Sequence, residues 1–176
     1  MRITYRRWEP ADVGGVRRIL HDTWMDAYSA FIPAGDLIRY LDEHYDADAL
    51  REFFEDPNVV GYVAVADNVL AGYARTYFHK DEQRLYVQQL YILPSFQGMG
   101  IGKQLMAFAA DHAKTFSLDR VWLGVMVQNI SALTWYQRMG YQITEKQPFT
   151  MGSTAVEHYV GYVPIDNIFA LSAEKQ

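Results

Sequence analysis

The sequence predicts a mixed α/β domain in which helices pack against a sheet. Runs rich in β-branched and aromatic residues recur along the chain, and two of them are separated by a two-residue turn typical of a hairpin. Helical stretches with an apolar face fall between the runs without a strict strand–helix repeat. The chain has 176 residues, of which 50% are apolar, so we expect one domain spanning residues 1–176.

The first third of the chain is predicted to be mainly helical. A short strand, Ile3 to Trp8, precedes Glu9-Pro10-Ala11-Asp12, which is typical of a helix start. The apolar positions that follow have helical spacing: Val13, Val16, Ile19 and Leu20. Pro33 interrupts this pattern, and we expect a second helical region from about Asp36 to Phe54.

The middle of the chain changes to strand patterns. Asp56-Pro57-Asn58 indicates a turn. Val59 to Ala66 and Val69 to Phe78 are predicted to pair as a hairpin. Leu85 to Leu93 is predicted as a further strand, which stops because a proline follows it.

Helices and strands alternate in the last third. Gly100 to about Phe116 is predicted to be helical, and Val121 to Val127 is a strand that is apolar on both faces and therefore central. Ser131 to Met139 is predicted as a short helix ended by a glycine. With strands at Tyr141 to Thr144 and Val156 to Val163, we expect about seven strands and about four helices.

Composition excludes several kinds of function. Sixteen basic against 21 acidic residues give a net charge of -5, which disfavours a nucleic-acid partner. Without cysteine there is no disulfide, thiolate nucleophile or cysteine zinc site, and the five histidines lack metal-ligand spacing, so we expect no metal. No apolar run approaches the ~18 residues of a membrane span and no signal peptide is visible, so we expect a cytoplasmic protein without a membrane partner.

The most informative segment is Gln97-Gly98-Met99-Gly100-Ile101-Gly102-Lys103, which follows a strand and opens a helix. The first turn of a helix carries N–H groups without intrahelical partners and a partial positive charge. Glycines let a phosphate approach these groups without a Cβ in the way. The segment therefore predicts an anion-binding site.

Three anion-binding patterns compete for this segment. The P-loop pattern fails at two positions, because Gln97 replaces its first glycine and Gln104 replaces its magnesium-binding hydroxyl residue. A dinucleotide fingerprint fails at one position, because Lys103 stands where its third glycine is required. The pattern Gln/Arg-x-x-Gly-x-Gly/Ala is matched throughout, by Gln97, Gly100 and Gly102.

With this context, the sequence resembles the GNAT superfamily of N-acetyltransferases over most of its length. Leu90-Tyr91-Ile92-Leu93-Pro94 is similar to the family's fourth strand. Residues 129–141, Asn-Ile-Ser-Ala-Leu-Thr-Trp-Tyr-Gln-Arg-Met-Gly-Tyr, resemble its Asn-x-x-Ala-x-x-Phe/Trp-Tyr-x-x-x-Gly-Phe/Tyr element. Residues 121–125 and 149–152 resemble the PaiA-like branch, which is akin to spermidine/spermine N-acetyltransferases.

The resemblance implies a central mixed, mostly antiparallel sheet that splays between strands 4 and 5 and holds acetyl-coenzyme A in the gap. A bulge near Gln88 or Gln89 would produce the splay. The amides of the pantetheine arm would pair with strand backbone near Leu90 and Ile92, and the diphosphate would lie on the helix start. The implied cofactor-binding residues are Leu90, Tyr91, Ile92, Gln97, Gly98, Met99, Gly100, Ile101, Gly102, Lys103, Asn129, Tyr136 and Arg138. Solvation of Lys103 and Arg138, and helix capping by Asn129, are competing interpretations.

The implied reaction moves an acetyl group from acetyl-coenzyme A to a primary amine of a small molecule, by direct attack in a ternary complex. A polyamine is one candidate acceptor. We expect Tyr136 to be the catalytic acid that protonates the leaving thiolate.

The general base is not evident, because Gln88 and Gln89 stand where many relatives carry glutamate. Asp22, Asp26 and Glu82 are candidates for this role or for substrate binding, and a solvated acidic face competes with that interpretation.

Two other functions stay open at this point, an acyl-coenzyme A-binding regulatory protein without turnover and a nucleotide-binding module. A homodimer through the aromatic C-terminal strands is also plausible.

Overall fold

The computed structural model describes residues 1–173, which form a seven-stranded sheet and six α-helices. The strands are β1 (Ile3–Arg7), β2 (Val59–Ala66), β3 (Val69–His79), β4 (Arg84–Ile92), β5 (Arg120–Met126), β6 (Gln142–Met151) and β7 (Thr154–Pro164). The helices are α1 (Val13–Tyr28), α2 (Ala34–His44), α3 (Ala47–Glu55), α4 (Ile101–Thr115), α5 (Ile130–Arg138) and α6 (Ile165–Ala173). The predicted mixed α/β class and the mostly antiparallel sheet are confirmed.

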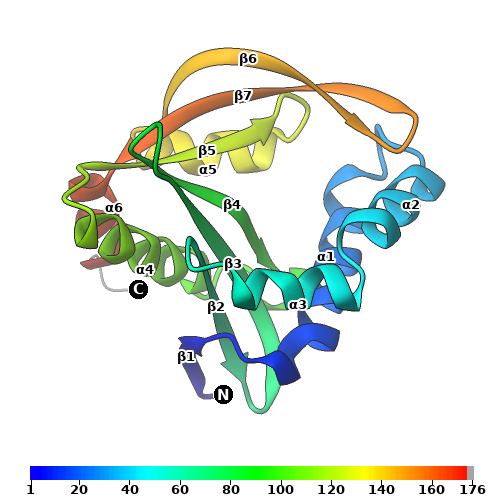
Figure 1. Ribbon diagram of the computed structural model, residues 1–176, viewed down its shortest axis with the longest axis horizontal. Helices are drawn as coiled ribbons and strands as arrows, with labels where there is room; N and C mark the ends of the chain where they lie inside the picture. Colours follow the sequence, from blue (N-terminus) through cyan, green and yellow to red (C-terminus); the bar gives the residue numbers. More distant parts are fainter. Residues whose placement is uncertain (174–176) are drawn as a thin grey trace.

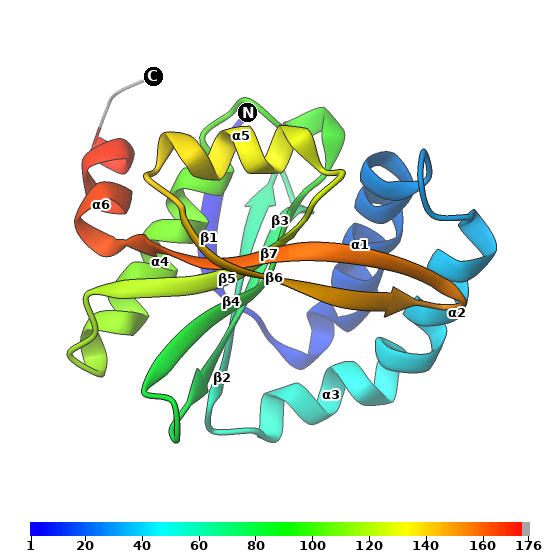
Figure 2. The same ribbon diagram turned by 90° about the horizontal axis from the view of Figure 1, so that it is seen from above.

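The sheet has the order β1-β2-β3-β4-β5-β7-β6, in which β4 and β5 are parallel and all other neighbours are antiparallel. Helices α1, α2 and α3 lie on one side of the sheet, and α4 and α6 lie on the other (Figures 1 and 2). The strand predicted to be central, β5, lies between β4 and β7, and Val121 and Leu123 on it are fully or almost fully buried.

The sheet opens between β4 and β5. Their register has only two pairs, Tyr86 with Trp122 and Val87 with Leu123. The next residue of β4, Gln88, is the extra residue of a bulge, because Thr76 of β3 lies opposite Val87 whereas Arg75 lies opposite Gln89. This bulge bends β4 away from β5, as predicted, and leaves the β5 side of β4 without a strand partner beyond Val87.

The helices differ from the prediction in number. The region from 36 to 54 is two helices, because the chain leaves helical geometry at Tyr45 and Asp46. The Asp46 carboxylate accepts a hydrogen bond from the Ala49 amide at 2.8 Å, which caps the start of α3. Helix α6 was not predicted, because it follows β7 directly and the chain offers no turn signal there.

The predicted strand from 141 to 144 is also too short. Strand β6 extends to Met151, although residues 142–148 are exposed and mostly polar. It lies at the edge of the sheet and pairs with β7 alone. Such an edge strand lacks the apolar pattern by which strands are recognised in a sequence.

Each face of the sheet packs against its own apolar cluster. The cluster under α1, α2 and α3 includes Trp24, Leu37 and Tyr73, whereas α4, α5 and α6 share a second cluster that includes Met106, Leu123 and Ile168. Within residues 1–173, no helix is both long enough and apolar enough to cross a bilayer.

Candidate active site

A cleft of about 1130 Å³ opens where β4 and β5 diverge. Its walls come from α1, the second half of β4, the start of α4, the end of β5, the start of α5, and the β6–β7 hairpin. Because the cleft occupies the gap left by the bulge, its position follows from the one irregularity in the β3–β4 pairing.

The glycine-rich turn forms one end of this cleft. Gly98 and Gly100 both have φ of +78°, a left-handed backbone conformation that residues other than glycine rarely adopt. Gly100 is the residue before α4, and the amide of Gln104 is the first to bond back to it, at 3.2 Å. The preceding amides of Ile101, Gly102 and Lys103 therefore have no intrahelical acceptor and can receive an anion.

The turn is fixed to the strand that precedes it. The Gln97 side-chain amide donates to the Ile92 carbonyl at 3.2 Å. A Cβ added at Gly102 would lie 3.0 Å from Cζ2 of Trp135 and 3.4 Å from Cδ1 of Ile92. The start of α4 is thus packed closely against β4 and α5, which gives the free amides a defined position.

The structure brings most of the predicted cofactor residues to this cleft. Those that line it are Leu90, Tyr91, Ile92, Gln97, Gly98, Gly100, Ile101, Gly102, Lys103, Asn129 and Tyr136. Met99 and Arg138 are not among the residues that line it, and both side chains are exposed; Met99 nevertheless lies between Gly98 and Gly100 in the turn that forms one end of the cleft. We therefore keep Met99 in the proposed cofactor site through its backbone amide alone and leave Arg138 out of it.

Asn129 combines the two predicted roles. Its side-chain oxygen accepts from the Ala132 amide at 3.1 Å and caps α5. The same residue lines the cleft.

Tyr136 lies on α5 and lines the cleft with a side chain that is 8% exposed. Burial raises the pKa of its hydroxyl well above the ordinary value, so the group stays protonated at neutral pH. Tyr141 differs, because its hydroxyl donates to the carbonyls of Leu123 at 3.2 Å and Tyr159 at 3.0 Å and thereby ties β5 to β7. Tyr136 makes no comparable bond within residues 1–173, so its proton is free for chemistry.

The three acidic candidates have different positions. Asp26 lines the cleft and is exposed. Asp22 does not line it, and its carboxylate is 3.5 Å from the Arg18 guanidinium and 2.9 Å from the His21 ring. Although Asp22 and Asp26 are one helical turn apart, only Asp26 is directed to the site.

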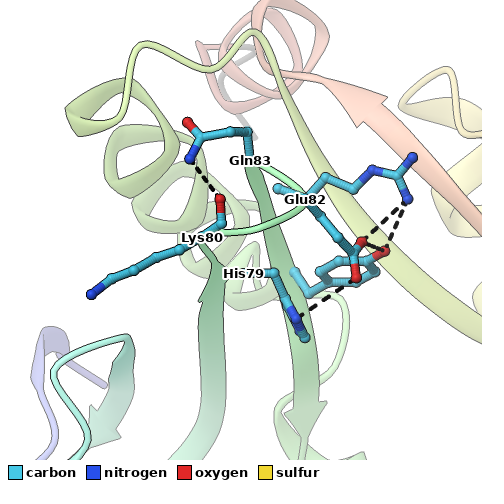
Figure 3. Close-up of polar contacts among 6 residues, drawn as sticks. His79, Lys80, Glu82 and Gln83 are labelled. Atoms are coloured by element: carbon cyan, nitrogen blue, oxygen red, sulfur yellow. Dashed lines mark hydrogen bonds and ion pairs between the residues drawn. The ribbon is translucent and has the colours of Figure 1, made fainter.

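Glu82 lies in the turn between β3 and β4, outside the cleft (Figure 3). Its carboxylate accepts from the Tyr86 hydroxyl at 3.1 Å and from Arg84 at 3.4 Å, and it lies 3.9 Å from the His79 ring. These contacts engage the carboxylate in the turn itself. We therefore withdraw Glu82 and Asp22 from the candidate site.

A histidine and an arginine in the cleft were missed by sequence reasoning. His158 of β7 lines it, and burial lowers the pKa of its imidazole, which is therefore neutral near pH 7. Arg75 of β3 also lines it and is 4% exposed. Neither lies in a recognisable motif; strand alternation alone, counted from the bulge, could have placed Arg75 beside Gln89.

Metal chemistry has no candidate centre in residues 1–173, where no group of three or more histidine, aspartate or glutamate side chains is placed to hold an ion.

Comparison with known proteins identifies related sequences and folds. The family described as "Acetyltransferase (GNAT) family" matches residues 18–141. An uncharacterised N-acetyltransferase from Lactobacillus delbrueckii subsp. lactis is 26% identical over 140 residues, which cover 76% of this chain and 81% of that protein. An aminoalkylphosphonate N-acetyltransferase from Salmonella typhimurium is 28% identical over 148 residues, covering 80% and 93% of the two chains.

Among solved structures, the PaiA N-acetyltransferase of Thermoplasma acidophilum, crystallised in complex with coenzyme A, superposes with a TM-score of 0.80. The superposition covers 93% of this chain and 99% of that chain at 19% sequence identity. At this identity the likeness shows a shared fold.

Proposed function

The chain belongs to the GNAT family of acetyltransferases and is an acyl-coenzyme A-dependent N-acetyltransferase, and on this premise we propose that it acetylates a primary amine of a small molecule by direct attack in a ternary complex. One observation carries the placement of the cofactor. The free amides at the start of α4 face the gap between β4 and β5, next to two glycines held in left-handed geometry. The diphosphate would bind these amides, and the pantetheine arm would run along the unpartnered edge of β4.

The cleft fits such a ligand in chemistry as well as in size. Lys103 lines it beside the free amides and adds a positive charge near the expected diphosphate. The β4 backbone beyond Val87 offers N–H and C=O groups to the amides of the arm, because β5 has already diverged. Asn129 lines the same cleft from the start of α5.

In the proposed reaction the amine nitrogen attacks the thioester carbonyl carbon, so that a C–N bond forms and the C–S bond breaks. The departing sulfur takes the proton of the Tyr136 hydroxyl, and the proton lost by the amine nitrogen restores Tyr136 through solvent. Burial keeps Tyr136 protonated, which is the state that an acid requires before the step.

Two groups in the cleft can receive the proton of the amine, Asp26 and His158. The lowered pKa of His158 leaves its imidazole neutral and able to accept a proton near pH 7. Replacement of His158 by asparagine should shift the rising limb of the pH–rate profile if His158 is the acceptor, whereas Asp26→Asn should lower kcat if Asp26 is.

The acceptor expected from the PaiA-like resemblance, a polyamine, stays a prediction. A polyamine site would be expected to present several carboxylates, and among the described residues that line the cleft Asp26 is the one carboxylate. The relative that acts on aminoalkylphosphonates supports a wider class of acceptors, namely small molecules with a primary amine.

The proposal is tested by release of free thiol from acetyl-coenzyme A in the presence of a panel of primary amines. Thiol release with at least one amine supports an enzyme, whereas binding of coenzyme A without turnover of any amine would favour the regulatory alternative. The anion site is tested separately by replacing Gly102 with glutamate, which places a negative charge in the second position of α4.

Gly14 offers a matched control, because it occupies the same second position of α1 and has open space around it. Gly102→Glu should abolish binding of coenzyme A, measured by calorimetry, and Gly14→Glu should leave it unchanged. If folded Gly102→Glu protein binds coenzyme A as tightly as the parent, the proposed anion site is wrong.

A further inference from the structure

Arg75 is a buried cation without an anionic partner. Its side chain lines the cleft, yet its Nε and Nη1 atoms are buried and have no hydrogen-bond partner in the described chain. None of the ion pairs formed within residues 1–173 includes it. Arginine is rarely buried unless it is paired, and it does not lose its charge at any accessible pH.

Aromatic contacts hold the Arg75 guanidinium in place without neutralising it. The guanidinium carbon lies 3.7 Å from the centroid of the Phe53 ring and 5.7 Å from that of Tyr45. Cation–π attraction offsets part of the cost of burial, but it uses the faces of the guanidinium and leaves its in-plane N–H donors free. Those donors match a planar or tetrahedral oxyanion.

Gln89 supplies the complementary group. It lies directly opposite Arg75 in the β3–β4 register, lines the same cleft and is 4% exposed. Its Oε1 atom is buried and has no hydrogen-bond partner, so the two neighbours do not bond to each other. A glutamate at this position would neutralise Arg75, whereas glutamine leaves the positive charge available and still offers one acceptor oxygen.

The diphosphate of the cofactor does not explain this pair. Arg75 packs against Phe53 of α3 and Tyr45, on the side of the sheet that α1, α2 and α3 cover. Helix α4, whose first turn forms the proposed diphosphate site, lies on the opposite side (Figure 2). The Arg75 and Gln89 side chains therefore line the part of the cleft on the α1, α2 and α3 side of the sheet, away from the proposed diphosphate site.

We propose that the acceptor amine carries an anionic group close to its nitrogen, a carboxylate or a phosphonate, which binds Arg75 while Gln89 accepts a hydrogen bond from the amine. Cross-strand neighbours on one face have Cβ atoms about 5 Å apart, which suits an amine and an anion separated by one to three carbons. This inference rests on the proposed function and narrows its acceptor to amino acids and aminoalkylphosphonates.

The first experiment compares matched amines with the parent protein. Thiol release is measured with L-amino acids and their carboxamides, with 2-aminoethylphosphonate and ethanolamine, and with spermidine. We expect kcat/KM for the anionic member of at least one pair to exceed that for its neutral partner by on the order of 100-fold, the effect of hydrogen bonds to a charged group. The amino-acid and phosphonate arms show which anion is preferred. Equal rates within every pair, or the highest rate with spermidine, would overturn the inference and leave the acetyltransferase proposal intact.

The second experiment alters the pair itself. Arg75→Met and Gln89→Glu should each lower the ratio of the anionic to the neutral rate by on the order of 100-fold, the first by removing the charge and the second by neutralising it. Arg84→Met is the matched control, because Arg84 stacks 3.8 Å from the Trp122 ring centroid but lies outside the cleft, and this variant should keep the ratio. A ratio that is unchanged in both Arg75→Met and Gln89→Glu would overturn the inference.

Calorimetry separates this inference from the proposed function. Titration of the coenzyme A-saturated parent with the same anionic and neutral amines measures the preference without turnover. If no amine releases thiol but the anionic amines bind more tightly, the proposed catalysis fails and the anion site stands. If neither member of any pair binds or reacts preferentially, the anion site fails.

Discussion

Replacing Tyr136 by phenylalanine removes one hydroxyl and leaves the ring in its packing against Trp135, whose centroid lies 4.8 Å away. A positioned acid contributes about 10²–10⁴-fold, which corresponds to about 2.7–5.4 kcal/mol of barrier. The lower end is expected here, because a thiol with a pKa of ~8.5 is already a fair leaving group. We therefore expect kcat of Tyr136→Phe to fall by about 10²-fold, measured by thiol release at saturating acetyl-coenzyme A and amine.

The stability of Tyr136→Phe should hardly change, because the Tyr136 hydroxyl makes no hydrogen bond within the described chain. A shift in the free energy of unfolding below about 0.5 kcal/mol is expected, measured by urea denaturation. The matched control is Tyr141→Phe, which loses bonds to two carbonyls and should cost about 1–2 kcal/mol while retaining activity.

The pH dependence provides a second test of Tyr136. Burial raises the pKa of Tyr136 above the ordinary value of 10, so the parent rate should rise with pH as the amine loses its proton and show no decline from Tyr136 below pH 10. If Tyr136→Phe matches the parent rate at every pH, the assignment of the acid is refuted.

Two further predictions concern stability. Gly161→Ala should destabilise the protein by more than about 3 kcal/mol in urea denaturation, because its Cβ would lie 2.1 Å from the backbone oxygen of Gln142, whereas Gly14→Ala has open space and should be neutral or stabilising. A smaller loss for Gly161→Ala would mean that β6 can move away from β7. Burial also raises the pKa of Tyr73, so the unfolded chain ionises first as the pH passes 10 and stability should fall above that pH. Tyr73→Phe should reduce this alkaline loss, measured by thermal melts between pH 9 and pH 11, and an identical loss in the variant would show that other groups cause it.

Local patterns in the sequence determined a large part of the fold. The hairpin of β2 and β3, the strand β4 that ends before a proline, and the helix that starts after Gly100 each follow from residues close together in the chain. The anion site at α4 belongs to the same class, since glycine geometry and free amides are properties of one short segment. A resemblance carried by two such segments was therefore sufficient to predict the splayed sheet and the bulge at Gln88.

The tertiary structure alone decided which of the candidate residues share the cleft. Asp22 and Asp26 are one turn apart on α1, yet only Asp26 lines it, and Glu82 is engaged within its own turn. Arg75 and Gln89 lie on different strands and become neighbours only through the register of β3 and β4. The sequence determines the charge of each side chain and its spacing along the chain. The burial of a side chain and its hydrogen-bond or ion-pair partners depend on which elements pack together. The buried, unpartnered charge that distinguishes this site therefore exists only in the folded protein.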